Sequence, residues 1–456
     1  MESFEQIVEQ ISTWLWGWPM IILLLGTHLF LTIRLRFPQL RIITAIRLSF
    51  RKDEDSVGDV SHFSALATSL AATIGTGNII GVATAVTLGG PGAVLWCWIT
   101  GVFGIATKYS EGLLSVKYRV QTSNGEMLGG PMYAIERGLK IKWLAVLFCI
   151  FTALAAFGIG NTVQANSIST LLNETWGLSP HITGVAISVL TVLVIVFGLK
   201  GIAKVCAVLV PFMSAFYIAG CLIILFINRA YLGESLSMIV NSAFSARAAG
   251  SGFLGSTIMV AARYGIARGL FSNESGLGSA PIVAAAAKAR NPVRQALVSS
   301  TGTFWDTVII CALTGLVLVS TILANPDIDH TKGAVLTKVA FEKIPYAGSI
   351  ILSLGIILFT FSTILGWTYY AEKAVEYLGG KRWIKVYRIF WVIAIYIGAV
   401  VNLKLVWDIA DSMNALMAIP NLVSLLLLSG VIVKETRKYL WSNNLDLKNT
   451  DEIPKV

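Results

Sequence analysis

Apolar runs long enough to cross a membrane recur along the chain, and they constrain its fold more than any other feature. A bilayer core takes about 20 apolar residues per helix. Hydrophobic residues make up 55% of the 456 residues and charged residues only 13%, against about 25% in an average soluble chain. Much of the surface must therefore face lipid, and we predict an all-α polytopic membrane protein. Eleven transmembrane helices are predicted, at residues 11–33, 61–88, 92–118, 142–171, 179–198, 203–227, 252–287, 295–323, 346–376, 383–403 and 408–434.

The loops between these spans differ in charge. Short cytoplasmic loops of membrane proteins collect Lys and Arg, and every second loop here does so, starting with residues 34–52 and ending with the tail after residue 434. This alternation predicts a multi-pass protein with its N-terminus outside and its C-terminus in the cytoplasm. It also attributes the net charge of +10 to contact with the anionic lipid bilayer, so no nucleic acid partner is expected.

Two of the spans, 61–88 and 252–287, are interrupted by glycine and proline. The interrupting residues are Gly75, Gly77 and Gly81 in the first and Gly269, Gly276, Gly278 and Pro281 in the second. Each interruption opens a block of five spans, so the second block is inverted relative to the first. Paired interruptions at matching places indicate inverted repeats with a binding site near the midplane. The predicted division is an extra N-terminal helix with a basic cytoplasmic loop (1–60), the first repeat (61–228), an external connection (229–251), the second repeat (252–436) and a cytoplasmic tail (437–456).

The first interruption reads Gly75-Thr76-Gly77-Asn78. Unwound backbone inside a bilayer is tolerated only where it lines a cavity or is packed in protein. Its free N–H groups attract a carboxylate, and its free carbonyls bind a cation. A glycine-rich packing face is the alternative, but four glycine or polar residues in succession at mid-span favour a ligand site.

The second interruption contains Phe271, Asn273 and Glu274. Asn273 could meet an ammonium group or a cation, and Phe271 could cover a small apolar side chain. An ionisable residue at this depth is by default a functional candidate. Glu274 could equally pair with Arg268 or cap the half-helix that follows.

Hydroxyl groups gather in a later span, at Thr360, Ser362 and Thr363. Adjacent hydroxyls beside freed carbonyls make an oxygen site that suits a small cation. The alternative is that each hydroxyl bonds a carbonyl of its own helix, which is common. Trp367, one helical turn further on, could close a pocket or simply fill one.

Further polar residues at mid-span are Gln164, Asn166, Asp306 and Thr307. A lone buried Gln is as often a link between helices as a ligand. Asp306 could serve coupling or pair with an Arg of a neighbouring span.

Several classes of protein are disfavoured. The five cysteines (Cys97, Cys149, Cys206, Cys221 and Cys311) lie inside apolar runs without CxxC spacing, so they are predicted to be packing thiols. The four histidines are scattered, and neither HExxH nor GxSxG is present, so no enzyme is predicted. A channel would need polar residues along one whole face of a span, and none shows them.

Four segments carry a family resemblance. They are Ala72-Thr73-Ile74-Gly75-Thr76-Gly77-Asn78-Ile79-Ile80-Gly81-Val82-Ala83, Leu88-Gly89-Gly90-Pro91-Gly92-Ala93, Gly129-Gly130-Pro131-Met132-Tyr133-Ala134-Ile135-Glu136-Arg137-Gly138 and Arg268-Gly269-Leu270-Phe271-Ser272-Asn273-Glu274-Ser275-Gly276-Leu277-Gly278-Ser279-Ala280-Pro281. Together they span most of the chain, and the third is highly specific. In them the chain resembles the alanine or glycine:cation symporter family (sodium:alanine symporters), whose members are prokaryotic.

The resemblance implies a leucine-transporter-like fold of the APC superfamily, with ten spans in a 5+5 inverted repeat after one extra N-terminal helix. It implies sodium-coupled uptake of a small neutral amino acid, alanine or glycine, by alternating access, with Na+ as the co-transported ion. The location implied is the prokaryotic plasma (inner) membrane.

Site residues also follow from the resemblance, position by position. The substrate-binding set implied is Thr76, Gly77, Gln164, Phe271, Asn273 and Trp367. The sodium site shared across the fold implies the carbonyls of Ala71 and Ile74 with the hydroxyls of Ser362 and Thr363, and a second cation is implied near Thr73, Asn78, Asn273 and Thr307.

Two points stay open beside the resemblance. Glu274 departs from the broader fold, so a proton-coupled amino-acid symporter that uses Glu274 or Asp306 is the closest alternative. The Gly129–Gly138 segment is predicted to be a fixed cytoplasmic loop with an ion pair between Glu136 and Arg137, serving gating or structure without contacting the substrate.

Overall fold

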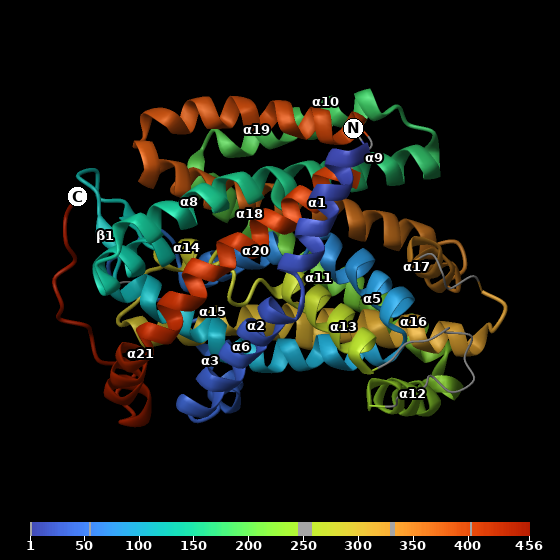
Figure 1. Ribbon diagram of the computed structural model, residues 1–456, viewed down its shortest axis with the longest axis horizontal. Coiled ribbons are helices and arrows are strands. Elements are labelled where there is room, and N and C mark those ends of the chain that lie inside the picture. Colours follow the sequence, from blue (N-terminus) through green and yellow to red (C-terminus); the bar gives the residue numbers. More distant parts are fainter. Residues whose placement is uncertain (1, 54–55, 245–257, 329–332, 402–403) are drawn as a thin grey trace.

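The computed structural model describes residues 2–53, 56–244, 258–328, 333–401 and 404–456, and helices account for nearly all of them (Figure 1). In the elements below, η denotes a short 3-10 or π-helical turn. The first half of the chain forms α1 (Glu2–Leu15), α2 (Trp18–Arg34), η1 (Pro38–Arg41), α3 (Ile42–Ser49), α4 (His62–Thr73), η2 (Gly77–Gly81), α5 (Val82–Gly89), α6 (Gly92–Lys117), β1 (Val120–Gln121), β2 (Met127–Leu128), α7 (Pro131–Tyr133), η3 (Ala134–Leu139), α8 (Lys142–Phe157), η4 (Gly158–Thr162), α9 (Val163–Trp176), α10 (Pro180–Ile195), α11 (Gly198–Ile227), η5 (Arg229–Tyr231) and α12 (Leu232–Phe244).

The second half continues in the same manner. It forms α13 (Ile258–Asn273), α14 (Pro281–Ala284), α15 (Pro292–Thr303), η6 (Phe304–Cys311), α16 (Ala312–Ala324), α17 (Gly333–Glu342), α18 (Gly348–Gly379), α19 (Arg382–Val400), α20 (Lys404–Leu427), α21 (Ser429–Thr436) and η7 (Arg437–Trp441). Strands β1 and β2 pair antiparallel, with Val120 opposite Leu128.

The number of membrane crossings can be compared with the eleven predicted. Seven helical segments among the described residues are long and apolar enough to cross a bilayer, and the bent pair of α4 with η2–α5 adds an eighth if the pair is one span. The three other predicted spans coincide with α6, α10 and α13–α14, which fall short of that test. Helix α10 has only 16 residues, and α6 carries Lys108 and Glu111 in its interior. Helix α13 is described from Ile258 to Asn273, and residues 252–257 of that predicted span lie outside the described residues. Among the described residues, length and apolarity alone therefore support seven crossings, or eight with the bent pair.

The leading segment differs from the prediction in two ways. The predicted span 11–33 is divided into α1 and α2, because Pro19 near the start of α2 cannot continue the preceding helix. The basic loop that follows is also partly helical, since it contains α3. This short helix exposes Ile43 while it buries Leu48.

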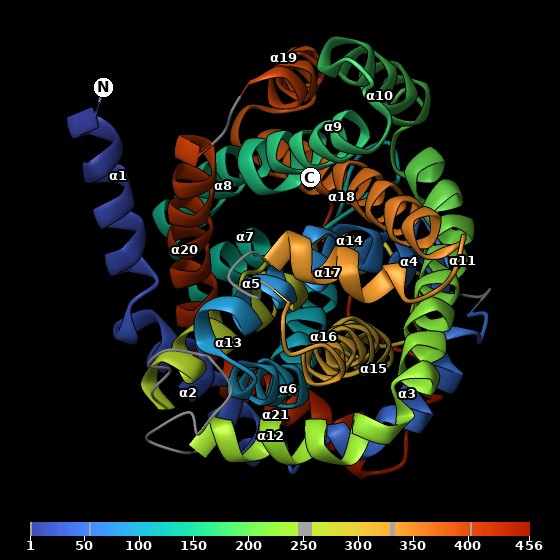
Figure 2. The same ribbon diagram turned by 90° about the vertical axis from the view of Figure 1, so that its right-hand side faces the viewer.

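The long helices pack in two groups (Figure 2). Helix α6 packs against α13 and α15, while α18 packs against α8, α11 and α4. Helices α10 and α19 pack against each other beyond α9. Small residues allow the close contacts: a Cβ on Gly269 would lie 2.2 Å from the Thr100 hydroxyl oxygen, and one on Gly265 would lie 2.3 Å from the Ala93 carbonyl oxygen. Each group thus contains one interrupted helix, α13 in the first and α4 in the second.

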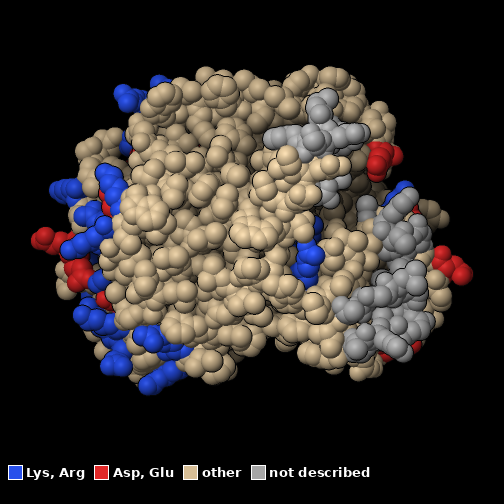
Figure 3. Space-filling view, in the orientation of Figure 1, with Lys and Arg blue, Asp and Glu red and all other residues tan. Residues whose placement is uncertain are grey.

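Basic side chains gather at one end of the molecule, around β1, α3 and α21, where the C-terminus also lies (Figures 1 and 3). The C-terminal tail is held there. The Gln121 N–H donates to the Pro454 carbonyl, and the Val456 N–H donates to the Gln121 carbonyl, at 2.9 Å each. Asp446 accepts from the buried Arg294 at 2.6 Å. The tail therefore covers the ends of α6 and α15.

Candidate functional site

The first interruption lies between α4 and η2, where the two helical segments meet at 53°. Ile74 leaves the helix in an extended conformation, with ψ of 94°. Gly75 follows, and a Cβ there would lie only 2.6 Å from the Thr363 hydroxyl. Glycine is therefore required for α18 to approach the break so closely. The segment after it, η2, is a π-helical turn, a feature that is frequent at functional sites.

Two hydroxyls of α18 face two carbonyls of α4. Ser362 Oγ donates to Ala71 O at 3.1 Å, and Thr363 Oγ1 donates to Ile74 O at 3.3 Å. Both hydroxyls also lie within hydrogen-bond distance of Phe359 O in their own helix. All four implied sodium ligands are buried. The structure thus brings together residues nearly 300 positions apart into a set of neutral oxygens, which is the type of site that binds Na+ in broken-helix carriers.

A small cavity of ≈180 Å³ lies beside the same break and contacts both interrupted helices. Its lining includes Thr76, Gly77 and Phe271 of the implied substrate-binding set, together with Arg268. A Cβ on Gly77 would lie 3.2 Å from the Phe271 ring and from Ser272 Cα. The absence of a side chain at Gly77 therefore lets the two interrupted helices meet at this cavity.

The other three implied substrate residues lie near the breaks, but they do not line this cavity. Gln164 donates to Thr76 Oγ1 at 3.3 Å and to a carbonyl of its own helix. Trp367 is fully buried and donates its indole N–H to Glu274 at 2.9 Å. Asn273 Oδ1 accepts the N–H of Ser275 at 2.9 Å, while its Nδ2 is buried without a hydrogen-bond partner.

A buried carboxylate, that of Asp306, lies at the second implied cation site. Asp306 in η6 accepts from Asn78 Nδ2 at 2.7 Å, from Ser272 Oγ at 2.9 Å and from Thr307 Oγ1 at 2.6 Å. Asn78 Oδ1 in turn accepts the N–H of Gly75 at 2.9 Å. All these donors are neutral. The hydroxyl of Thr73, by contrast, bonds Leu70 O of its own helix at 3.4 Å, so the structure gathers Asn78 and Thr307 and leaves Thr73 outside this cluster.

The second interruption is held by charged residues that sequence reasoning missed. Lys108 Nζ donates to Asn273 O at 2.8 Å. One carboxylate oxygen of Glu111 accepts the N–H groups of Gly276 and Gly278, at 3.0 and 3.1 Å. Lys108 and Glu111 are buried. They lie in α6, which was predicted only as a span, although an ionisable residue inside a span is itself a signal.

Glu274 neither pairs with Arg268 nor caps the half-helix that follows, which were the two structural roles expected from sequence. It adopts a left-handed backbone conformation with φ of 55°. Its carboxylate accepts from Trp367 and from the Ser279 hydroxyl, so it joins α18 to the second break. Arg268 instead lies over the Phe271 ring, with its guanidinium carbon 5.8 Å from the centroid.

The Gly129–Gly138 segment also differs from the expected fixed loop. It is largely helical, since it forms α7 and the π-helical η3. Gly130, with φ of 121°, begins it in a conformation that favours glycine. Glu136 accepts from Tyr377 at 2.9 Å and lies 3.8 Å from Lys142, so these partners replace the expected pair with Arg137.

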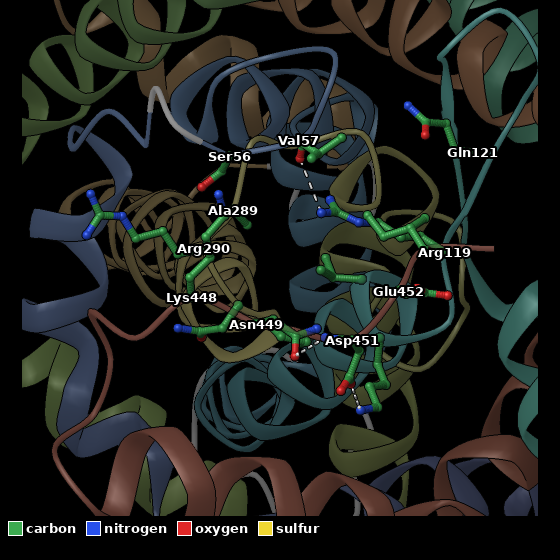
Figure 4. A pocket seen from close by; sticks show the side chains of 15 residues that line it. Ser56, Val57, Arg119, Gln121, Ala289, Arg290, Lys448, Asn449, Asp451 and Glu452 are labelled. Carbon is green, nitrogen blue, oxygen red and sulfur yellow. Dashed lines mark hydrogen bonds and ion pairs between the residues drawn. The ribbon is translucent and has the colours of Figure 1, made fainter. Parts of the chain in front are cut away.

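A larger cavity of ≈290 Å³ lies under the C-terminal tail (Figure 4). Arg119 points across it and donates to Val57 O at 3.2 Å. Asn449 and Asp451 of the tail form the opposite wall. Loops and the tail enclose this space, so the smaller cavity between the broken helices is the candidate substrate site. No group of three or more His, Cys, Asp or Glu residues that could hold a metal ion occurs within the described part of the chain.

Two interrupted helices that meet at a small cavity inside a membrane helix bundle are the arrangement of a secondary carrier. Sequence comparison identifies which carriers these are. The sequence model of the sodium:alanine symporter family matches residues 1–453, and the chain belongs to that family. The predicted family is thereby confirmed, and the protein is a transporter rather than an enzyme.

Individual relatives agree with this assignment. The sodium/alanine symporter AgcS of Methanococcus maripaludis is 49% identical over 455 residues, covering 98% of this chain and 100% of that protein. Among solved structures, MhsT in complex with L-phenylalanine matches with a TM-score of 0.57 at 15% identity, over 86% of this chain and 94% of that one. A Na+-coupled sialic acid symporter matches with a TM-score of 0.53 at 13% identity, over 84% and 82%. At such identities these structures establish the leucine-transporter-like fold alone.

Proposed function

We propose that the protein carries a small neutral amino acid, alanine or glycine, into the cell together with sodium by alternating access. The observation that carries this proposal is that the Ser362 and Thr363 hydroxyls face the Ala71 and Ile74 carbonyls. A sodium ion held by these oxygens would join α4 to α18 and order the first break. The name of the relative AgcS, a sodium/alanine symporter, supports the same ion and substrate.

The substrate would lie in the ≈180 Å³ cavity between the broken helices. The half-helix that starts at η2 directs its free N–H groups and positive dipole end toward this point, so Thr76 and Gly77 would hold the substrate carboxylate. Phe271 would cover the side chain. A pocket discriminates one methylene group by only about 1–3 kcal/mol, so alanine and glycine would compete.

Three further residues would surround this cavity and support the substrate site: Gln164, Asn273 and Trp367. Gln164 would fix the Thr76 hydroxyl, and Trp367 would close the space beside Glu274. The unpaired group of Asn273 is the donor Nδ2, since Oδ1 already accepts from Ser275. A donor fits the substrate carboxylate better than its ammonium group, so we assign Asn273 to the carboxylate.

A second cation would lie beside Asp306. Asn78 and Thr307 from the implied set converge there, and Ser272 joins them. An ionised carboxylate surrounded by neutral donors inside a bilayer favours a cation close by. A proton on Asp306 or Glu274 would neutralise the same charge, and this makes proton-coupled symport the second candidate.

The architecture that we propose for transport is the 5+5 inverted repeat with eleven crossings. The first repeat (61–228) and the second (252–436) would each open with an interrupted helix, after the leading segment 1–60. Basic side chains gather at the end that carries the C-terminus (Figure 3), which supports a cytoplasmic C-terminus and an external N-terminus in a prokaryotic plasma membrane. The inward gradient of sodium and the membrane potential, about 2.3 kcal/mol per charge per 100 mV, would drive uptake.

Uptake of labelled alanine into proteoliposomes tests this function. We expect uptake to require an inward sodium gradient and to fall to background when choline replaces sodium at fixed pH. Undiminished uptake in choline that follows an imposed proton gradient would refute sodium coupling and favour the proton-coupled alternative.

A further inference from the structure

An apolar groove of ≈260 Å³ runs between α3, α4, α11 and η6. Its floor is buried and includes Leu66, Ala67 and Leu70 of α4. Its mouth is exposed and includes Phe50, whose side chain is 70% exposed, and Ala215 of α11. The groove therefore opens to the molecular surface and ends against the first broken helix.

This groove opens toward lipid. Helix α11 is among the segments long and apolar enough to cross a membrane, and near the groove it exposes Val208 by 73% and Phe212 by 61%. Ser49 and Ser214 are the serines of the lining. Ser49 bonds its own helix at Ala45 O, while the buried hydroxyl of Ser214 has no hydrogen-bond partner. The lining therefore offers an entering molecule mainly apolar walls.

The mouth of the groove is flanked by positive charge. Arg47 is exposed and lies one helical turn before Phe50. Arg51 follows Phe50 directly and lies 3.3 Å from Asp446 of the tail. Helix α3 also exposes Ile43 by 65%. A short helix with exposed apolar and basic residues is typical of the interface between headgroups and acyl chains, where it meets anionic lipid.

We propose that this groove binds one acyl chain of an anionic phospholipid, whose phosphate lies beside Arg47. The apolar floor excludes an amino acid, and the positive charge of Arg47 complements a phosphate. Because the floor belongs to α4, which ends at the Ala71 and Ile74 carbonyls, the lipid holds the first broken helix against α11. This site is independent of the ion that the carrier uses.

Native mass spectrometry with added palmitoyl-oleoyl phosphatidylglycerol tests the groove. Ala215→Phe fills the mouth, and Val208→Phe adds the same ring to the lipid-facing side of the same helix. We expect the amount of tightly bound lipid retained by Ala215→Phe to be at least fivefold lower than in the wild type. Val208→Phe should retain as much lipid as the wild type. Both variants should elute as single species, which separates lost lipid from lost fold. Equal lipid retention in all three proteins would overturn the proposal.

The headgroup is tested with Arg47→Gln, and Arg41→Gln, further from the mouth, is its matched control. The wild type and Arg41→Gln should prefer phosphatidylglycerol to phosphatidylcholine at least threefold, and Arg47→Gln should lose that preference. Equal binding of both lipids by the wild type would overturn the assignment to an anionic lipid. A dimer without lipid that Ala215→Phe disrupts would identify a second copy of the chain as the occupant and refute the proposal.

Discussion

The hydroxyl of Thr363 on α18 lies 3.3 Å from the main-chain oxygen of Ile74, where α4 stops being helical. The same hydroxyl lies 3.0 Å from Phe359 O, one turn back in its own helix. It therefore has an acceptor within α18 whether or not it also faces α4. A group satisfied in this way can turn its oxygen lone pairs to a cation without leaving a buried polar atom unpaired.

Thr363→Ala removes one oxygen from the proposed sodium site. Hydrogen bonds and contacts to a charged group are worth about 1.5–3 kcal/mol, so we expect the sodium concentration for half-maximal uptake to rise roughly tenfold or more. Alanine affinity at saturating sodium should change much less. Thr360→Ala is the matched control, since that buried hydroxyl bonds Ile356 O within its own helix. The same sodium dependence in both variants would remove Thr363 from the site.

Gly366→Ala tests the contact between α18 and the first broken helix. A Cβ at Gly366 would lie 2.7 Å from the main-chain nitrogen and the Cβ of Ala72. Overpacking of this kind costs about 1–3 kcal/mol, and it would push α18 away from the carbonyls of α4. We expect lower thermal stability and loss of sodium-dependent uptake.

Gly26→Ala is the control for that substitution, because nothing lies within 4 Å of its added Cβ. Ala is favoured over Gly in a helix interior by about 0.5–1 kcal/mol, so this variant should be as stable as the wild type or slightly more so. Normal sodium-dependent uptake by Gly366→Ala would contradict the close contact between α18 and α4.

The pH dependence of stability should report Asp53, near the end that carries the tail. Burial by itself would raise the pKa of this carboxyl, but the hydrogen bond with His62 and the positive charge of Arg294 at 2.9 Å hold it below the ordinary value of 3.8. A depressed pKa gives stability that is present above the ordinary value and is lost as the pH falls through the folded value. Thermal stability should therefore decline below about pH 4 in part through this group.

Asp53→Asn leaves the fully buried Arg294 without its buried partner. Breaking a buried pair costs about 3–5 kcal/mol, so the melting temperature at pH 7 should fall clearly, and the variant should lose less stability than the wild type on acidification. Asp446→Asn removes the exposed partner of the same arginine and should cost about 0–1 kcal/mol. Equal melting temperatures for the two variants at pH 7 would contradict the role given to Asp53.

Asp306→Asn tests the second cation. The variant keeps the shape and one acceptor oxygen but loses the charge, so we expect sodium affinity measured by uptake to fall roughly tenfold, as for a lost charged contact of about 1.4 kcal/mol or more. Cys311→Ala is a control, because its sulfur lies 3.3 Å from Asn78 Nδ2 and 3.2 Å from Ser272 Oγ but carries no acceptor oxygen for a cation. Unchanged sodium affinity with altered pH dependence would assign Asp306 to a proton.

The sequence predicts some parts of this site better than others. The interruption at Gly75 and Gly77 is readable because two closely spaced glycines next to Thr76 and Asn78 disrupt an otherwise apolar span. The pairing of Ala71 with Ser362 cannot be read from the sequence, since no spacing rule connects residues 291 positions apart. Only the family resemblance predicts this pairing.

The supporting residues were missed for a different reason. Lys108 and Glu111 interrupt an otherwise apolar span, but the partners that stabilise them are main-chain groups of the second break, and main-chain groups leave no signature in sequence. Glu274 was recognised, whereas its partner Trp367 was assigned to the pocket. Side-chain direction at a strained φ cannot be read from residue type.

The most direct test of sodium-coupled symport is the simultaneous uptake of ²²Na+ and labelled alanine into the same proteoliposomes, in the wild type and in Thr363→Ala, with Thr360→Ala as control. We expect each substrate to accelerate the entry of the other in the wild type and in Thr360→Ala, and this mutual dependence to weaken in Thr363→Ala at low sodium. Alanine entry without any accompanying ²²Na+ in the wild type would contradict sodium-coupled symport.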